Sequence, residues 1–121
     1  MTEAEQIEYL ANLYFVARLD GRVDSSEDAL AEEMAKGIGA GYLETRKAVD
    51  LSATSDYAIR IPRRFSERVR NLEDMIHMAY HSDGLDADEK KTIIEFAQNI
   101  GVTQTQLEKI RKEAKERLQE K

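Results

Sequence analysis

The chain has 121 residues, 41% of them hydrophobic and 35% charged, with a formal net charge of −6. This length suits one compact domain around a single hydrophobic core. The sequence contains no cysteine, which excludes disulfides, thiolate metal sites and cysteine catalysis. No apolar stretch approaches the roughly 18 residues of a membrane span, and the acidic N-terminus is unlike a signal peptide. We therefore expect a cytoplasmic protein without membrane insertion.

Helical periodicity runs through the chain, and no stretch alternates apolar and polar residues as a strand would. The first expected helix begins at the capping pair Thr2 and Glu5, and its broad apolar face places it at the centre of the fold. A second begins at Asp24, and a third covers about residues 42–51. The core positions expected of these helices are Ile7, Leu10, Leu13, Tyr14, Val16 and Ala17; Leu30, Ala31, Met34, Ala35 and Ile38; and Leu43, Ala48 and Leu51.

A polar linker, at about residues 52–63, should separate these helices from three more. Pro62 disfavours helical geometry at the residue before it, so the fourth helix should start after Pro62. The fifth should start at the cap Asp86 and the sixth at the cap Thr103. Their expected core positions are Phe65, Val69, Leu72, Ile76, Ala79 and Tyr80; Ile93, Ile94, Phe96, Ala97 and Ile100; and Leu107, Ile110, Ala114 and Leu118. The sequence predicts an all-α fold.

An internal repeat relates the two halves of the chain. The segment that starts at Ala17 aligns with the segment that starts at Tyr80, and after a gap of one residue the offset stays at 62. The matched pairs include Asp24 with Asp86, Glu27 with Glu89, Ile38 with Ile100, and Gly39 with Gly101. We therefore predict a single compact helical bundle of two pseudo-repeated three-helix units, at about residues 3–51 and 64–120.

The repeated motifs are Asp20-Gly21-x-Val23-Asp24-x-x-Glu27 and Asp83-Gly84-Leu85-Asp86-x-x-Glu89. With them, the chain resembles the TerB-like family, which is named for tellurite-resistance protein B and includes a helical domain of the DjlA-type co-chaperones. The likeness covers nearly all of residues 1–121, although Leu19 and Ser82 stand where the family usually has alanine. The resemblance implies a helical bundle connected with stress response and, by a family-level proposal, with binding or sensing of metal ions through the acidic turns.

The acidic residues of these turns are candidate ligands for a divalent metal ion: Asp20, Asp24, Glu27, Asp83, Asp86 and Glu89. Ca²⁺ and Mg²⁺ need several converging oxygens, but an EF-hand is excluded, because the bidentate glutamate would fall on Ala31 or Ile94. Helix capping explains the Asp-x-x-Glu pairs better, as carboxylates in solvated turns. Asp20 and Asp83 are less well explained, because a carboxylate at a helix C-terminus faces the negative end of the helix dipole and needs a partner. We favour turn architecture and leave metal binding open.

His77 and His81 lie one helical turn apart, a spacing that suits Zn²⁺. They stand opposite the expected apolar stripe of their helix, so we expect them to be exposed, and two solvated histidines are the favoured interpretation. Residue 78 is a methionine where a metalloprotease motif needs glutamate.

Charge is uneven along the chain, because residues 1–60 hold 12 acidic and 6 basic side chains while residues 61–121 hold 12 of each. Five arginines gather at the start of the second half: Arg60, Arg63, Arg64, Arg68 and Arg70. The acidic composition argues against nucleic acid. We expect these arginines to face the acidic first half or an acidic protein partner.

No enzyme motif is present, since the chain has neither a phosphate-cradling glycine loop nor a nucleophile set on suitable turns. We therefore expect a non-catalytic stress-response or adaptor module of the TerB-like kind that binds a protein partner. The alternative is a divalent-cation sensor that uses the six acidic residues. A more remote possibility is an enzyme with a metal at His77 and His81.

Overall fold

The computed structural model describes residues 1–19, 23–81 and 86–119, and all regular structure in these ranges is helical. The helices are α1 (Glu3–Arg18), α2 (Ser25–Gly37), α3 (Tyr42–Ser52), α4 (Phe65–His81), α5 (Ala87–Asn99) and α6 (Gln104–Gln119). The all-α prediction is confirmed. None of the helices in the described ranges is both long and apolar enough to cross a membrane.

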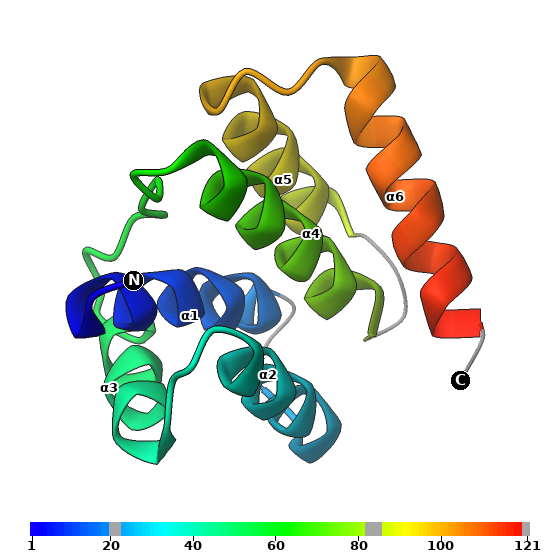
Figure 1. Ribbon diagram of the computed structural model, residues 1–121. Helices are drawn as coiled ribbons and strands as arrows, with labels where there is room; N and C mark the ends of the chain where they lie inside the picture. Colours follow the sequence, from blue (N-terminus) through cyan, green and yellow to red (C-terminus); the bar gives the residue numbers. More distant parts are fainter. Residues whose placement is uncertain (20–22, 82–85, 120–121) are drawn as a thin grey trace.

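The first helix lies at the centre of the bundle, as expected. In the stretch 9–17 only Phe15 keeps appreciable solvent exposure. Helix α1 packs against α2, α3 and α4, so each side of it meets a different neighbour (Figure 1). Burial of a large apolar side chain is worth about 1.5–3 kcal/mol, so this helix contributes much of the stabilisation of the fold.

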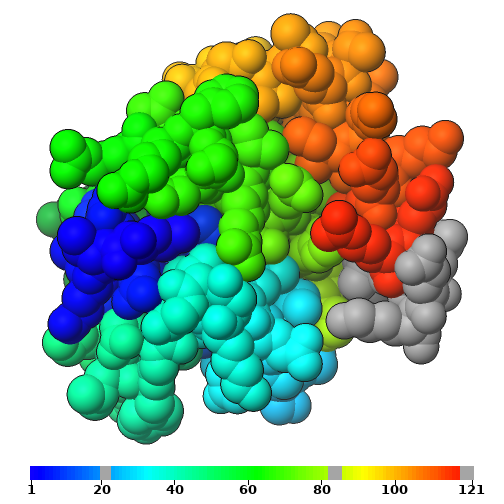
Figure 2. Space-filling model, viewed as in Figure 1, coloured from blue at the N-terminus to red at the C-terminus, as the bar shows by residue number. Residues whose placement is uncertain are grey.

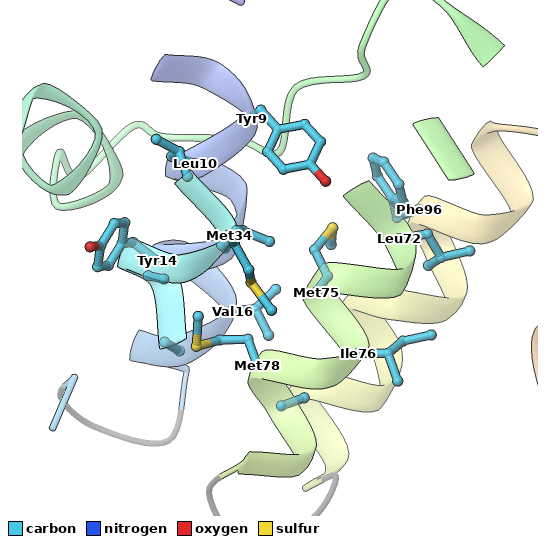
Figure 3. Close-up of a cluster of buried hydrophobic side chains, with 14 of the residues drawn as sticks. Tyr9, Leu10, Tyr14, Val16, Met34, Leu72, Met75, Ile76, Met78 and Phe96 are labelled. Atoms are coloured by element: carbon cyan, nitrogen blue, oxygen red, sulfur yellow. The ribbon is translucent and has the colours of Figure 1, made fainter. Parts of the chain in front are cut away.

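The core joins the two halves of the chain across the contact between α1 and α4. Figure 3 shows Tyr9, Val16 and Met34 from the first half facing Met75 and Met78 from the second. These side chains are at most 9% exposed. Helix α4 also packs against α5 and α6, just as α1 packs against α2 and α3, so each half has the same pattern of helix neighbours.

Two positions expected in the core are exposed instead. Leu43 is 66% exposed and Phe65 is 64% exposed. Both lie in the first turn of a helix, whereas the buried residues of α3 are Ala48 and Ser52, nearer its other end. In α4 burial begins only at Asn71, so Phe65 precedes the part of the helix that reaches the core. The side chain of Leu118 lies outside the described residues.

Helix ends in the two halves share their local geometry at positions 62 residues apart. The carboxylates of Asp24 and Asp86 accept hydrogen bonds from the backbone N–H groups of Glu27 and Glu89, at 2.7 and 2.8 Å. Each glutamate in turn accepts from its cap residue at 3.2 Å, which completes a capping box. Both α2 and α5 are followed by a glycine with positive φ, at residues 39 and 101. Superposition of the complete halves remains a prediction.

The linker is bound to the core by a buried asparagine. Asn12 in α1 donates hydrogen bonds to the carbonyl of Arg60 and to Oδ1 of Asn71, both at 2.7 Å. Its own Oδ1 accepts from the Tyr57 hydroxyl at 2.5 Å and from the Arg60 N–H at 3.0 Å. Because this one side chain of α1 binds both the linker and α4, it fixes the path of the chain between the two halves.

Candidate functional site

The candidate metal ligands are only partly within the described residues. Asp20 and Asp83 lie outside them. Asp24 and Asp86 are exposed N-caps. The backbone N–H of Glu27 and the hydroxyl of Ser26 hold the pKa of the Asp24 carboxyl below its usual value, because both stabilise the charged form. The capping interpretation of these two aspartates is confirmed.

The two glutamates of the motifs are not solvated, which corrects the expectation from sequence. Glu27 is 2% exposed and Glu89 is 1% exposed. In a capping box the glutamate side chain turns back over the first turn of its own helix, and here it is buried while its neighbours in that turn are exposed. These carboxylates therefore help to fix the start of α2 and α5 within the packed fold.

Among the described residues, no group of three or more histidine, aspartate and glutamate side chains could hold a metal ion. His81 is exposed as expected, while His77 is half-buried. Helix α2 packs against α4, and the charge of His81 is the weakest of the influences that lower the pKa of Asp24. Metal binding by the six acidic residues remains the open alternative, and it depends on Asp20 and Asp83.

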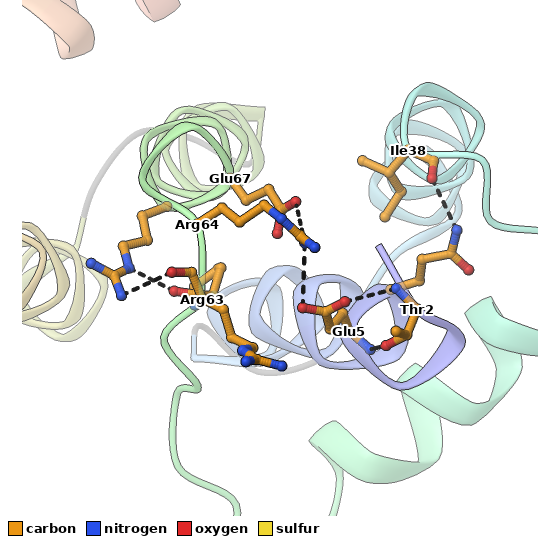
Figure 4. A network of polar contacts seen from close by, with 9 residues as sticks. Thr2, Glu5, Ile38, Arg63, Arg64 and Glu67 are labelled. Atoms are coloured by element: carbon orange, nitrogen blue, oxygen red, sulfur yellow. Dashed lines mark hydrogen bonds and ion pairs between the residues drawn. The ribbon is translucent and has the colours of Figure 1, made fainter.

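The arginine cluster faces the acidic first half, which confirms that expectation for two of its members. Arg60 lies 3.4 Å from the carboxylate of Glu8. Arg64 bridges Glu5 of α1, at 3.6 Å, and Glu67 of α4, at 3.1 Å. Figure 4 shows this bridge beside the capping contacts of Thr2. The arginine side chains of these ion pairs are 52% and 60% exposed, so each pair contributes at most about 1 kcal/mol.

Two further arginines bind backbone carbonyls. Arg68 donates to the carbonyls of Pro62 and Arg63, at 2.6 and 3.1 Å, and Arg70 donates to the carbonyl of Gly37 at 3.1 Å. Within the described part of the chain, this leaves Arg63 as the one arginine of the cluster whose side chain has neither a hydrogen bond nor an ion pair. Arg63 is exposed.

Exposed apolar side chains lie near this arginine along the chain or line the same cavity, which three glutamates also line. We call Met1, Ile61, Arg63 and Phe65 together the Arg63 patch. Met1, Ile61 and Phe65 are 38%, 45% and 64% exposed, and the first two line a shallow cavity of about 110 Å³ with Arg63. In Figure 2 the N-terminal end of α1, in blue, lies against the linker and the start of α4, in green. The sequence assigned Phe65 to the core, and only its position in the first turn of α4 could have indicated otherwise.

Two larger grooves occupy equivalent places in the two halves. One, of about 350 Å³, lies between α2 and α3, and the other, of about 320 Å³, lies between α5 and α6. All nine residues that line the second groove match lining residues of the first at the offset of 62. The pairs are Asp28–Lys90, Glu32–Ile94, Ala35–Ala97, Lys36–Gln98, Ala40–Val102, Tyr42–Gln104, Thr45–Leu107, Arg46–Glu108 and Val49–Arg111.

The two grooves differ in chemistry although they match in position. Asp28 in the α2/α3 groove is replaced by a base, Lys90, in the α5/α6 groove. Arg46 in the α2/α3 groove is replaced by an acid, Glu108, in the α5/α6 groove. In the α2/α3 groove, the hydroxyl of Tyr14 donates a hydrogen bond of 3.0 Å to the Asp28 carboxylate. Burial raises the pKa of the Tyr14 hydroxyl, so it stays protonated and acts as a donor. Neither groove was predicted from the sequence. The available signal is the change from an acid at Asp28 to a base at Lys90, two positions related by the offset of 62.

No family model, curated protein or solved structure matches the chain. The TerB-like resemblance therefore depends on the two repeated motifs and remains an expectation.

Proposed function

We propose that the chain is a cytoplasmic, non-catalytic adaptor module of the TerB-like kind, which serves stress response by binding a protein partner. The Arg63 patch is the contact surface for that partner. A non-catalytic role agrees with the lack of any enzyme motif in the sequence. The net charge of −6 disfavours nucleic acid as the partner, and an acidic protein suits the exposed arginine of the patch.

The observation that carries this proposal is the free charge of Arg63 among exposed apolar side chains. Four neighbouring arginines are occupied by carboxylates or carbonyls of the same chain, whereas the guanidinium of Arg63 is available. Arginine and aromatic residues dominate the energetics of protein interfaces, and Phe65 supplies an exposed aromatic ring two residues away.

The patch is also held in place before binding. Three of its four residues, Ile61, Arg63 and Phe65, follow closely on Arg60, whose N–H and C=O are both bound to Asn12. A surface that is already ordered loses less conformational entropy when a partner binds. We expect the partner to present a carboxylate for Arg63 beside an apolar side chain for Phe65.

The test is to identify and then titrate the partner. A photoreactive benzoylphenylalanine in place of Phe65 should cross-link it in cells, and titration calorimetry with the purified partner should show that Arg63→Glu weakens binding about tenfold or more. Lys109→Glu makes the same charge change on α6 and is the matched control, which should bind as the wild type does. If Arg63→Glu and Phe65→Ser bind the cross-linked protein as tightly as the wild type, the Arg63 patch is not the contact surface.

A further inference from the structure

We infer that the groove between α2 and α3 is a second docking surface, which holds a short amphipathic helix of a partner protein with basic residues near the N-terminal end of that helix. This inference rests on the proposed function, because it names an element of the partner that the same adaptor would bind.

The walls of the groove have the length and spacing that a helix needs. Asp28, Glu32 and Lys36 follow one another at four-residue intervals, so they lie along one side of α2. At 1.5 Å per residue this wall is about 12 Å long, which matches roughly two turns of a docked helix. The facing wall is the side of α3 that carries Tyr42 and Arg46.

The floor of the groove is apolar and made of small or buried side chains. Ala35, Ala40 and Val49 line it together with Tyr14, which is 1% exposed. The groove exists because α2 and α3 pack on α1 rather than on each other. Its volume of about 350 Å³ lies within the range of roughly 300–1,000 Å³ typical of ligand sites. Several apolar side chains of a docked helix would fit there.

The charges along the groove give it a direction. Asp28 and Glu32 belong to the first two turns of α2, while Lys36 lies beside the connection to α3. Arg46 stands on the opposite wall, and none of these charged groups forms an ion pair with another within the described residues. A helix has a positive N-terminus and a negative C-terminus. The docked helix is therefore favoured in the orientation that points its N-terminus toward Asp28.

Exposed apolar side chains at the start of α3 extend the docking surface. Tyr42, which lines the groove, is 76% exposed, and the adjacent Leu43 is 66% exposed. An exposed aromatic in the groove, with an exposed leucine next to it in α3, is a suitable anchor for the outer edge of an amphipathic helix.

The equivalent groove in the second half is an internal control within the same molecule. There, Leu107, which is 5% exposed, stands in place of Thr45, and Lys90 stands in place of Asp28. A basic N-terminal segment would meet Lys90 and Arg111 and be repelled. The inference therefore predicts binding at α2/α3 and not at α5/α6.

The experiment uses two synthetic helical peptides of about 14 residues, or roughly 21 Å. Both carry the same leucine stripe and the same stapled outer face. One has two lysines in its first half and two glutamates in its second, and the other has the reverse order, so composition and net charge are identical. Two-dimensional NMR of the full-length protein should show shifts at Ala35, Ala40 and Val49 with the first peptide, and about tenfold weaker binding of the second.

Variants of the groove complete the test. The double variant Asp28→Asn with Glu32→Gln keeps the size of both side chains and should abolish the preference between the peptides. The matched variant in the other groove, Lys90→Gln with Arg111→Gln, should leave that preference unchanged. The inference is overturned if neither peptide binds at about 1 mM, if both bind equally, or if the shifts fall on Ala97 and its neighbours. If the groove inference fails but Arg63→Glu still weakens binding of the cross-linked partner, the proposed role of the Arg63 patch is still supported.

Discussion

The hydroxyl of Tyr9 in α1 donates a hydrogen bond of 2.5 Å to the carboxylate of Asp74 in α4. This bond crosses the junction between the two halves of the chain. Burial raises the pKa of the Asp74 carboxyl, although the hydrogen bond from Tyr9 acts in the opposite direction. The central helix pair thus contains an acid whose charged form is disfavoured by its surroundings.

Replacing Asp74 with asparagine should remove a pH dependence of stability. Because the folded-state pKa of Asp74 lies above the unfolded value, this group stabilises the fold at low pH and loses that contribution as the pH rises through the folded pKa. Asp74→Asn keeps an acceptor for Tyr9. Its free energy of unfolding, relative to that of the wild type, should increase as the pH rises from 3.5 to 7. Urea unfolding across this range measures the difference, with the exposed Asp50→Asn as control. A difference that stays constant with pH would contradict this account.

Replacing Asn12 with alanine should destabilise the protein by about 3 kcal/mol, because buried groups of Arg60 and Asn71 lose their hydrogen-bond partners. Tyr57→Phe removes a single hydrogen bond from the same network and should cost about 1 kcal/mol. Denaturant unfolding of the two variants measures both values. A cost for Asn12→Ala no greater than that for Tyr57→Phe would show that the network does not hold the linker in place.

Alanine in place of Gly39 or Gly101 should be destabilising in both halves by a similar amount. Their φ angles are 78° and 82°, and a side chain in this left-handed region costs about 1–2 kcal/mol. An added Cβ at Gly101 meets nothing within 4 Å, so the cost there is one of backbone conformation. Thermal unfolding should show that asparagine is better tolerated than alanine at both positions. Unequal behaviour of the two sites would argue against equivalent helix ends.

Divalent cations should leave the melting temperature unchanged, because the backbone already occupies the oxygens of Asp24 and Asp86 that cap their helices. Melting curves in EDTA and in millimolar Ca²⁺, Mg²⁺, Mn²⁺ and Zn²⁺ provide the measurement. A bound cation would add about 2.7 kcal/mol at a hundredfold excess over its Kd. A rise that Asp20→Asn and Asp83→Asn remove would instead support the cation-sensor alternative.

Local features of this fold could be predicted from the sequence because they depend on neighbouring residues. The caps at Thr2, Asp24, Asp86 and Thr103 all form as expected, since each needs only a side-chain oxygen and an amide three residues away. The delay of α4 until after Pro62 has an equally local cause.

Features that depend on tertiary packing could not be predicted in the same way. The burial of Glu27 and Glu89 depends on which helices pack over these two side chains, and the capping pattern is the same whether the glutamate is buried or exposed. The role of Asn12 had one available signal, a polar residue inside an apolar run. Its partners, however, lie about 48 and 59 residues away, and long-range pairing of this kind is not encoded in periodicity.

Because α1 is covered on every side, neither half of the chain should be stable when separated from the other. Cleavage within residues 53–56, which are exposed and follow α3, would leave an N-terminal piece with the α4-facing side of its central helix in water. The two pieces should therefore assemble again when mixed, as the parts of a split reporter do.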